Sequence, residues 1–317
     1  MKNKKPILNL VIPCYNEEEA LPLTKEQLDK KMNELIKNEL ISKNSKVVLV
    51  NDGSKDNTWN IISKIHKENN MYVGINLAKN KGHQNALLAG LMYAKEHSDI
   101  SISMDADLQD DINVIDDMIN KYNNGIDIVY GVRSSRKKDT FFKKFTAEFF
   151  YKLMKFMGVE IIFNHADCRL MSKRALEGLS QYQEVNLFLR GIVPQIGYKT
   201  DIAYYERNER IAGDSKYPLK KMLTFAIDGI TSFSIKPLRM ISSIGFIILL
   251  LSIFVLCYSI IMKFLGNTVS GWTFIVCSIW LIGGIQTLCL GILGEYIGKI
   301  YNESKQRPRY IIENILD

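Results

Sequence analysis

Two aspartates separated by one residue, Asp105 and Asp107, give the clearest chemical signal in the sequence. Two carboxylates at this spacing can share a hard divalent cation such as Mg²⁺ or Mn²⁺, and the same cation can hold a diphosphate. Gln109 continues the alternation and could add an amide oxygen. The apolar run Ile100–Asp105 predicts a strand that ends at the first of the two aspartates. This position favours a metal site over an ordinary surface loop.

Polar residues after two earlier apolar runs suit a nucleoside. Asp52 could accept hydrogen bonds from a base N–H or a ribose hydroxyl, or it could cap the helix that begins at Thr58. Pro13 and Tyr15 could form an apolar wall for a nucleobase. Glu17 could reach the ribose, although an acidic residue also suits the first turn of a helix.

A third polar segment, Lys81–Asn85, begins a helical stretch that ends at His97. Its free N–H groups could contact a sugar or a phosphate. His83 alone is more often structural than functional. The sequence contains no Ser-His-Asp pattern, P-loop, GxGxxG motif or His/Cys cluster typical of a metal site.

These segments alternate with elements that would position them. Apolar, β-branched runs predict strands at Leu8–Pro13, Lys46–Asp52, Val73–Leu77, Ile100–Asp105 and Ile126–Val132. Amphipathic stretches predict helices at Glu17–Asn38, Thr58–Glu68, Gly82–His97 and Asn113–Asn123. This order predicts an α/β fold, a mostly parallel sheet with helices on both faces. Ligands of such sheets bind at the carboxyl ends of the strands, where the polar segments fall.

Two uncharged apolar stretches near the C-terminus, about 240–262 and 272–294, are each long enough to cross a ~30 Å hydrocarbon core. The short linker between them predicts a two-helix transmembrane hairpin. Basic residues flank the hairpin on its outer sides, and the positive-inside rule then places the globular part and both termini in the cytoplasm. The flanking residues are Lys216, Lys220, Lys221, Lys236, Arg239, Lys299, Lys305, Arg307 and Arg309. We therefore expect a multi-pass protein of the cell membrane.

Composition agrees with this location. The five cysteines include no CxxC pair, which fits a reducing compartment, and no cleavable signal opens the chain. The net charge of +7 is concentrated near the predicted membrane segments, so anionic lipids explain it better than nucleic acid. The number of subunits stays open, with a homo-oligomer possible.

Phenylalanines and lysines alternate at helical spacing over Asp139–Met157. This pattern fits an amphipathic helix on a membrane surface, and equally a helix packed on the sheet. We divide the chain into a cytoplasmic catalytic domain (1–212), an amphipathic juxtamembrane region (213–239), the hairpin (240–294) and a cytoplasmic tail (295–317).

Six motifs occur in an order that resembles a known family. They are Ile12-Pro-Cys-Tyr-Asn-Glu-Glu18, Val50-Asn-Asp-Gly-Ser-Lys-Asp-Asn-Thr58, Asn80-Lys-Gly-His-Gln-Asn-Ala-Leu-Leu-Ala-Gly90, Met104-Asp-Ala-Asp-Leu-Gln-Asp110, Gly131-Val-Arg133 and Asp167-Cys-Arg-Leu-Met-Ser172. The chain resembles the polyprenyl-phosphate glycosyltransferases of glycosyltransferase family 2, which include bactoprenol glucosyltransferases and dolichol-phosphate mannose synthases. The resemblance covers nearly the whole chain. Cys168 departs from the phenylalanine often found there.

The resemblance implies a GT-A nucleotide-sugar fold and an inverting transfer to polyprenyl phosphate for cell-envelope glycosylation. The residues that match the family's motifs take roles in three groups. The nucleoside would be held by Pro13, Tyr15, Glu17 and Asp52, while Arg210 and Lys216 would close over the phosphates. Mg²⁺ or Mn²⁺ would be organised by Asp105, Asp107 and Gln109. Arg133 would meet the acceptor phosphate, and Asp167 would lie at the reacting centre.

The favoured donor is UDP-glucose, with UDP-N-acetylglucosamine and GDP-mannose as alternatives. A processive polysaccharide synthase would share the early motifs, but such synthases usually carry a Gln-x-x-Arg-Trp segment that does not occur here. A membrane scaffold with an inactive transferase domain is a third reading. The retained Asp52, Asp105, Asp107, Asp167 and Arg133 argue against it.

Overall fold

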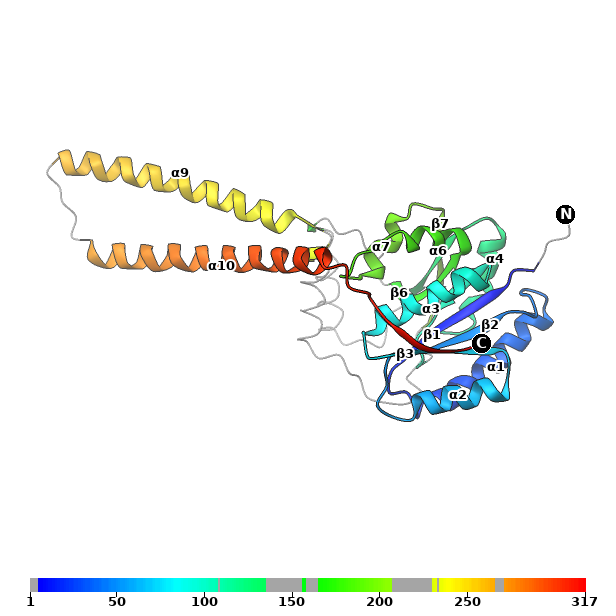
Figure 1. Cartoon of the computed structure of the whole chain (residues 1–317). Helices are drawn as coiled ribbons and strands as arrows, with labels where there is room; N and C mark the ends of the chain where they lie inside the picture. The colour runs from blue at the N-terminus through cyan, green and yellow to red at the C-terminus, as the bar shows by residue number, and fades with distance from the viewer. Residues whose placement is uncertain are drawn as a thin grey trace.

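The computed structural model shows an α/β domain from which two long helices project side by side (Figure 1). The structure describes residues 5–107, 109–134, 156–157, 165–206, 230–232, 234–265 and 271–317. Arg210, Lys216 and most of the predicted amphipathic helix 139–157 lie outside these residues.

Eight strands form one mixed sheet in the order β7-β5-β6-β4-β1-β2-β3-β8. β1 is parallel to β2 and β4, β2 to β3, and β5 to β7, whereas β6 is antiparallel to β4 and β5, and β8 to β3. Their bounds are β1 Leu8–Cys14, β2 Lys46–Asn51, β3 Tyr72–Leu77, β4 Ile100–Ser103, β5 Ile128–Arg133, β6 His165–Ser172, β7 Thr200–Tyr205 and β8 Ile312–Leu316. The predicted mostly parallel sheet is confirmed.

Helices cover both faces of the sheet, because successive side chains of a strand point to opposite faces. Leu10 and Ile12 of β1 pack in a core with α1, α2 and α4, while Val11 packs in a second core with α3, α6 and α7. The helix bounds are α1 Leu21–Lys37, α2 Thr58–Glu68, α3 His83–His97, α4 Val114–Asn123, α6 Lys173–Ser180 and α7 Leu189–Gln195. Because β1, β2 and β4 are parallel, the loops that follow them lie at the same carboxyl end of the sheet.

Three strands have no counterpart in the sequence analysis. β6 and β7 carry polar residues within their strands, and β8 is the last element of the chain, where only a tail was expected. β8 forms the sheet edge beside β3. The C-terminal residues therefore return to the α/β domain after the long helices (Figure 1).

The two long helices, α9 (Lys236–Phe264, 29 residues) and α10 (Trp272–Ser304, 33 residues), contain both predicted apolar stretches. Each is long and apolar enough to cross a membrane, and none of either candidate span is buried inside the structure. They lie alongside each other in opposite directions (Figure 1). The predicted helical hairpin is therefore present.

Candidate active site

The loops that follow β1 and β2 are held together by hydrogen bonds. The Asn16 N–H donates to Ser54 Oγ (3.0 Å), and Asn16 Oδ1 accepts from the Lys55 N–H (3.0 Å). One residue further on, the Glu17 N–H donates to Thr58 Oγ1 (2.9 Å). The two segments predicted to bind a nucleoside thus form one structural unit.

Asp52 joins this unit to the start of α3. Its side chain is buried, and its two oxygens accept the N–H groups of Lys81 (2.7 Å) and Gly82 (2.9 Å). Burial raises the pKa of Asp52, against the effect of these two hydrogen bonds and of His83. The Thr58 N–H donates to Asp56 Oδ1 (3.0 Å) and not to Asp52. Asp52 therefore holds the start of α3 and does not cap α2.

Gly53 allows the loop after β2 to approach the loop before α3. Its φ of +59° is a conformation that favours glycine, and a Cβ there would lie 2.4 Å from the backbone nitrogen of Asn80. No larger side chain fits without moving this backbone. The turn at Asp52–Gly53 therefore depends on glycine.

The other residues predicted to bind the nucleoside lie at the same carboxyl end of the sheet. Pro13 is buried in β1 beside Val50 of β2, while the Tyr15 side chain is 39% exposed just beyond the strand. Glu17 is half-buried. Tyr15 is thus accessible to a ligand, whereas the Pro13 ring belongs to the packed strand.

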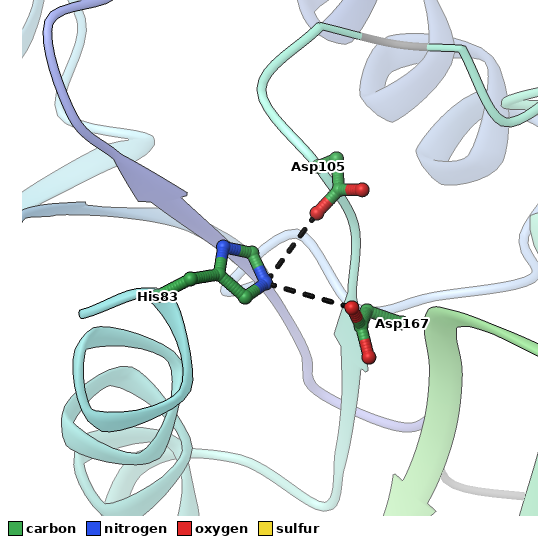
Figure 2. Close-up of side chains that lie close together, drawn as sticks. All are labelled: His83, Asp105 and Asp167. Carbon is green, nitrogen blue, oxygen red and sulfur yellow. Dashed lines mark ion pairs between the residues drawn. The ribbon is translucent and has the colours of Figure 1, made fainter. Parts of the chain in front are cut away.

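The pairing of β4 with β6 brings two distant aspartates together. Ser103 lies opposite Arg169 in an antiparallel register, so Asp105 and Asp167 follow at opposed positions just past the paired residues. His83, the first residue of α3, completes a cluster with them (Figure 2). His83 Nε2 lies 3.5 Å from Asp105 Oδ1 and 3.8 Å from Asp167 Oδ2.

The two aspartates of this cluster have opposite pKa shifts. Burial raises the pKa of Asp105 to about 6, with further increases from the carboxylates of Asp167, Asp110 and Asp107, while His83 opposes them. Burial also disfavours ionised Asp167, but the Arg190 guanidinium holds the pKa of Asp167 well below its usual range. Arg190 donates to both Asp167 oxygens, from Nε (3.0 Å) and Nη2 (2.9 Å).

The cluster fits a divalent cation. One ligand atom from each of His83, Asp105 and Asp167 lies within 4.8 Å of the others. Two carboxylates and an imidazole suit Mn²⁺, and carboxylates also suit Mg²⁺. Ionised Asp105 is costly without such a cation, because neighbouring carboxylates repel it.

The predicted set Asp105, Asp107 and Gln109 is only partly gathered in this cluster. Asp107 Oδ1 accepts the N–H of Gln109 (3.2 Å), which forms a tight turn after Asp105. Both side chains are half-buried. Asp105 is therefore the member of the predicted set that the structure places with His83 and Asp167.

Arg133 lies at the end of β5 and is held by an aspartate beside the cluster. Its Nη2 donates to Asp110 Oδ1 (3.2 Å), which also accepts the Tyr205 hydroxyl (2.6 Å). Burial would lower the pKa of Arg133, but Asp110 raises it, so the guanidinium stays charged. Arg133 Nε has no hydrogen-bond partner among the described residues. This Nε atom is buried, but the side chain as a whole is 27% exposed, so the site contains a fixed cation that is partly accessible.

Two arginines of the site were not assigned by the sequence analysis. Arg190 belongs to no quoted motif, and only the structure reveals its contact with Asp167. Arg169 lies within the Asp167–Ser172 motif but is buried in the sheet, with its guanidinium carbon 5.6 Å from the Tyr130 ring centroid. Its position two residues after Asp167 would have placed it on the same face as Asp167 only if this motif had been predicted as a strand.

Comparisons with known proteins place the chain in a family. The family described as Glycosyl transferase family 2 matches residues 9–180. The uncharacterized glycosyltransferase YkoT of Bacillus subtilis (strain 168) is 53% identical over 313 residues, covering 99% of this chain and 93% of the relative. The bactoprenol glucosyl transferase of Shigella phage SfV is 41% identical over 309 residues, covering 97% and 98%.

A third relative is the prophage bactoprenol glucosyl transferase homolog of Escherichia coli (strain K12). It is 41% identical over 310 residues, which cover 97% of this chain and 99% of that protein. The matches extend over the α/β domain and both long helices. The chain belongs to glycosyltransferase family 2 and is a glycosyltransferase with a GT-A-like fold.

Proposed function

We propose that this enzyme transfers glucose from UDP-glucose to polyprenyl phosphate at the cytoplasmic membrane face, with inversion at the anomeric carbon. The observation that carries the proposal is the near-complete alignment with proteins named bactoprenol glucosyl transferase, long apolar helices included. An acceptor in the bilayer explains why a transferase domain continues into two exposed apolar helices. The product would serve cell-envelope glycosylation.

The acceptor chemistry suits the cations of the site. A phosphate monoester has a second pKa of about 6 and is mostly dianionic at neutral pH, so it needs no strong base to attack an anomeric carbon. One of its oxygens forms the new bond to C1, the bond from C1 to the diphosphate breaks, and the nucleoside diphosphate leaves. The protein must bring two anions together, which requires positive charge near both.

Donor binding is proposed for the loops after β1, β2 and β4. Tyr15, Glu17 and Asp52 would bind the nucleoside, with Pro13 supporting the loop from within β1. Asp105 and Asp167, with His83, would hold Mg²⁺ or Mn²⁺, and Asp107 and Gln109 would complete the turn at its side. The cation would neutralise the leaving diphosphate. Arg210 and Lys216 would close over the phosphates.

The acceptor phosphate is proposed to meet Arg133. Its guanidinium is fixed by Asp110, and its Nε lacks a partner within the described part of the chain. A guanidinium can bind phosphate through two parallel hydrogen bonds. Asp110, which holds Arg133, is also close enough to Asp105 to raise its pKa, so Arg133 is linked to the proposed metal cluster through Asp110.

The proposed topology places residues 1–212 and the tail in the cytoplasm. The juxtamembrane region 213–239 would lie on the membrane surface, and the hairpin within 240–294 would span the bilayer. The basic residues on both sides of the hairpin support this orientation. A cytoplasmic site has direct access to nucleotide sugars.

A donor panel tests the proposal. Purified enzyme with Mg²⁺ or Mn²⁺ and a short polyprenyl phosphate should consume UDP-glucose faster than UDP-N-acetylglucosamine or GDP-mannose. A different preferred donor would revise the sugar and leave the acceptor in place. Products longer than one sugar would instead indicate a processive synthase.

A further inference from the structure

The C-terminal residues after α10 are part of the catalytic domain. β8 pairs with β3, with Ile315 opposite Ile75, and Asn76 Nδ2 of β3 donates to Glu313 Oε2 (2.7 Å). The Ala78 N–H donates to the carbonyl of Ile311 (3.0 Å). The end of the second long helix is thus connected to the sheet by an ordered segment.

At the end of α10, Glu303 holds the loop that precedes α7. Glu303 Oε2 accepts the N–H of Val185 and Oε1 accepts the N–H of Asn186, both at 2.9 Å. Further along the chain, Arg309 Nη1 donates to the carbonyl of Tyr182 (2.9 Å). The C-terminal segment therefore contacts this loop near both of its ends.

Tyr182 and Leu187 of this loop pack against the core around α3, α6 and α7, whereas the segment after α10 holds the loop through hydrogen bonds. A cavity of about 560 Å³ lies between residues 180–185 and residues 303–309, so the two segments are not closely packed. A carboxylate that accepts two N–H groups forms charge-assisted hydrogen bonds, which are stronger than those between neutral groups. Glu303 thus holds the middle of the loop from the side of α10.

The same loop continues directly into the active site. Three residues after Asn186, the N–H of Leu189 donates to Gln84 Oε1 of α3 (2.8 Å). The next residue, Arg190, forms the two hydrogen bonds to Asp167. The first turn of α7 therefore touches the helix that begins with His83 and the strand that carries Asp167.

We propose that Glu303 is a positioning residue for sugar transfer. By fixing residues 185–186 it places Arg190 on Asp167, and it links this placement to the helix that enters the membrane. The proposal rests on the proposed function of Asp167 at the reacting centre. Glu303 itself touches neither substrate nor cation.

The variant Glu303→Gln tests this role, because an amide can accept only one of the two hydrogen bonds and presents its NH₂ to the other N–H. We expect kcat to fall about tenfold while the Kd for nucleotide sugar changes less than about twofold. Glu303→Asp, which keeps the charge on a shorter side chain, should give an intermediate loss. Glu313→Gln is the matched control, because its amide oxygen can still accept from Asn76, and it should keep wild-type kcat.

A double-mutant cycle separates positioning through Arg190 from a general loosening. In an Arg190→Gln background, Glu303→Gln should reduce kcat by less than about twofold, since the contact that it positions is already absent. Losses that multiply fully would overturn the proposal. A rise in the nucleotide-sugar Kd that accounts for the whole loss of activity in Glu303→Gln would also overturn the proposal.

Hydrogen exchange provides a measurement that needs no turnover. In Glu303→Gln, the amides of residues 185–190 should exchange about tenfold faster, while those of β3 keep wild-type rates. Unchanged exchange over 185–190 would refute the positioning contact even if the enzyme used another acceptor. If the amides of residues 185–190 exchange faster in the variant but the wild-type enzyme does not transfer sugar to polyprenyl phosphate, only the proposed function would be refuted.

Discussion

The substitution Asp105→Asn should stabilise the metal-free protein while abolishing transfer. Asp105 lies beside His83, Asp167 and Asp110, and burial together with the nearby carboxylates raises its pKa from 3.8 to about 6. A raised carboxylate pKa means that ionisation of Asp105 destabilises the folded state. Asparagine removes the charge and keeps the size of the side chain.

The size of the effect follows from the pKa shift. A shift of about two units corresponds to roughly 3 kcal/mol at neutral pH. The Asp105 side chain is 36% exposed, so water screens much of this, and we expect about 1 kcal/mol. For a protein of this size, about 1 kcal/mol raises Tm by roughly 2–4 °C.

The pH dependence has a definite sign. The penalty in the wild type is complete above the folded-state pKa of about 6 and disappears as the pH falls toward the unfolded value of 3.8. The Tm advantage of Asp105→Asn should therefore be present at about pH 7.5 and absent at about pH 4. Thermal unfolding in detergent with EDTA, at both pH values, measures it.

A matched control is Asp117→Asn, which removes a carboxylate that is 53% exposed and lies 3.7 Å from Lys121. This variant should gain no stability at either pH. A lower Tm for Asp105→Asn at both pH values would refute the electrostatic reasoning. So would a gain that persists near about pH 4, because it could not come from the charge.

Four further predictions concern other parts of the chain. Arg133→Ala should raise the KM for the lipid acceptor at least about tenfold with donor KM unchanged, and Arg133→Lys should recover part of it; the reverse pattern in steady-state kinetics would assign Arg133 to the donor. Gly53→Ala should weaken nucleotide binding about tenfold in a titration, because its Cβ would meet the Asn80 backbone; wild-type affinity would show that the loop can move. Asp107→Ala removes the acceptor of the Gln109 N–H in the turn beside the proposed metal cluster, so metal-dependent transfer should fall at least about tenfold; near wild-type turnover of this variant would show that the turn is dispensable. A chain ending at Ile235 lacks β8, so gel filtration should show association through the β3 edge, whereas a stable monomer would make β8 dispensable.

Much of the fold could be predicted because the first five strands are buried and apolar. Leu8–Cys14 is buried along its whole length and is apolar except for Asn9, and such runs are typical of parallel strands covered on both faces. β7 was not predicted from the sequence for the opposite reason, since its first three residues are exposed or half-buried and include Thr200 and Asp201. β8 is a five-residue edge strand, and its partner β3 is more than two hundred residues away in the sequence.

Some residues of the candidate active site could likewise be predicted from the sequence, and others could not. Asp105 was found from its spacing and its place after a strand, and Asp167 from the family resemblance. Their contact depends on the antiparallel insertion of β6 between β4 and β5, which no local pattern reveals. Arg190 needs a further tertiary step, because it reaches Asp167 only through the placement of α7. His83 was interpreted as structural for want of a visible partner, and the partner proved to be this pair of aspartates.

The products of one reaction test the central claim most directly. Purified enzyme should be incubated with a divalent cation, UDP-glucose and polyprenyl phosphate, and the nucleotide and lipid products identified by ³¹P NMR and mass spectrometry. The account predicts equal amounts of UDP and of a glucosyl lipid with a single phosphate, whose anomeric configuration is opposite to that of the donor. UMP with a diphosphate-linked lipid, retention of configuration, or release of free glucose with the lipid phosphate unchanged would contradict it.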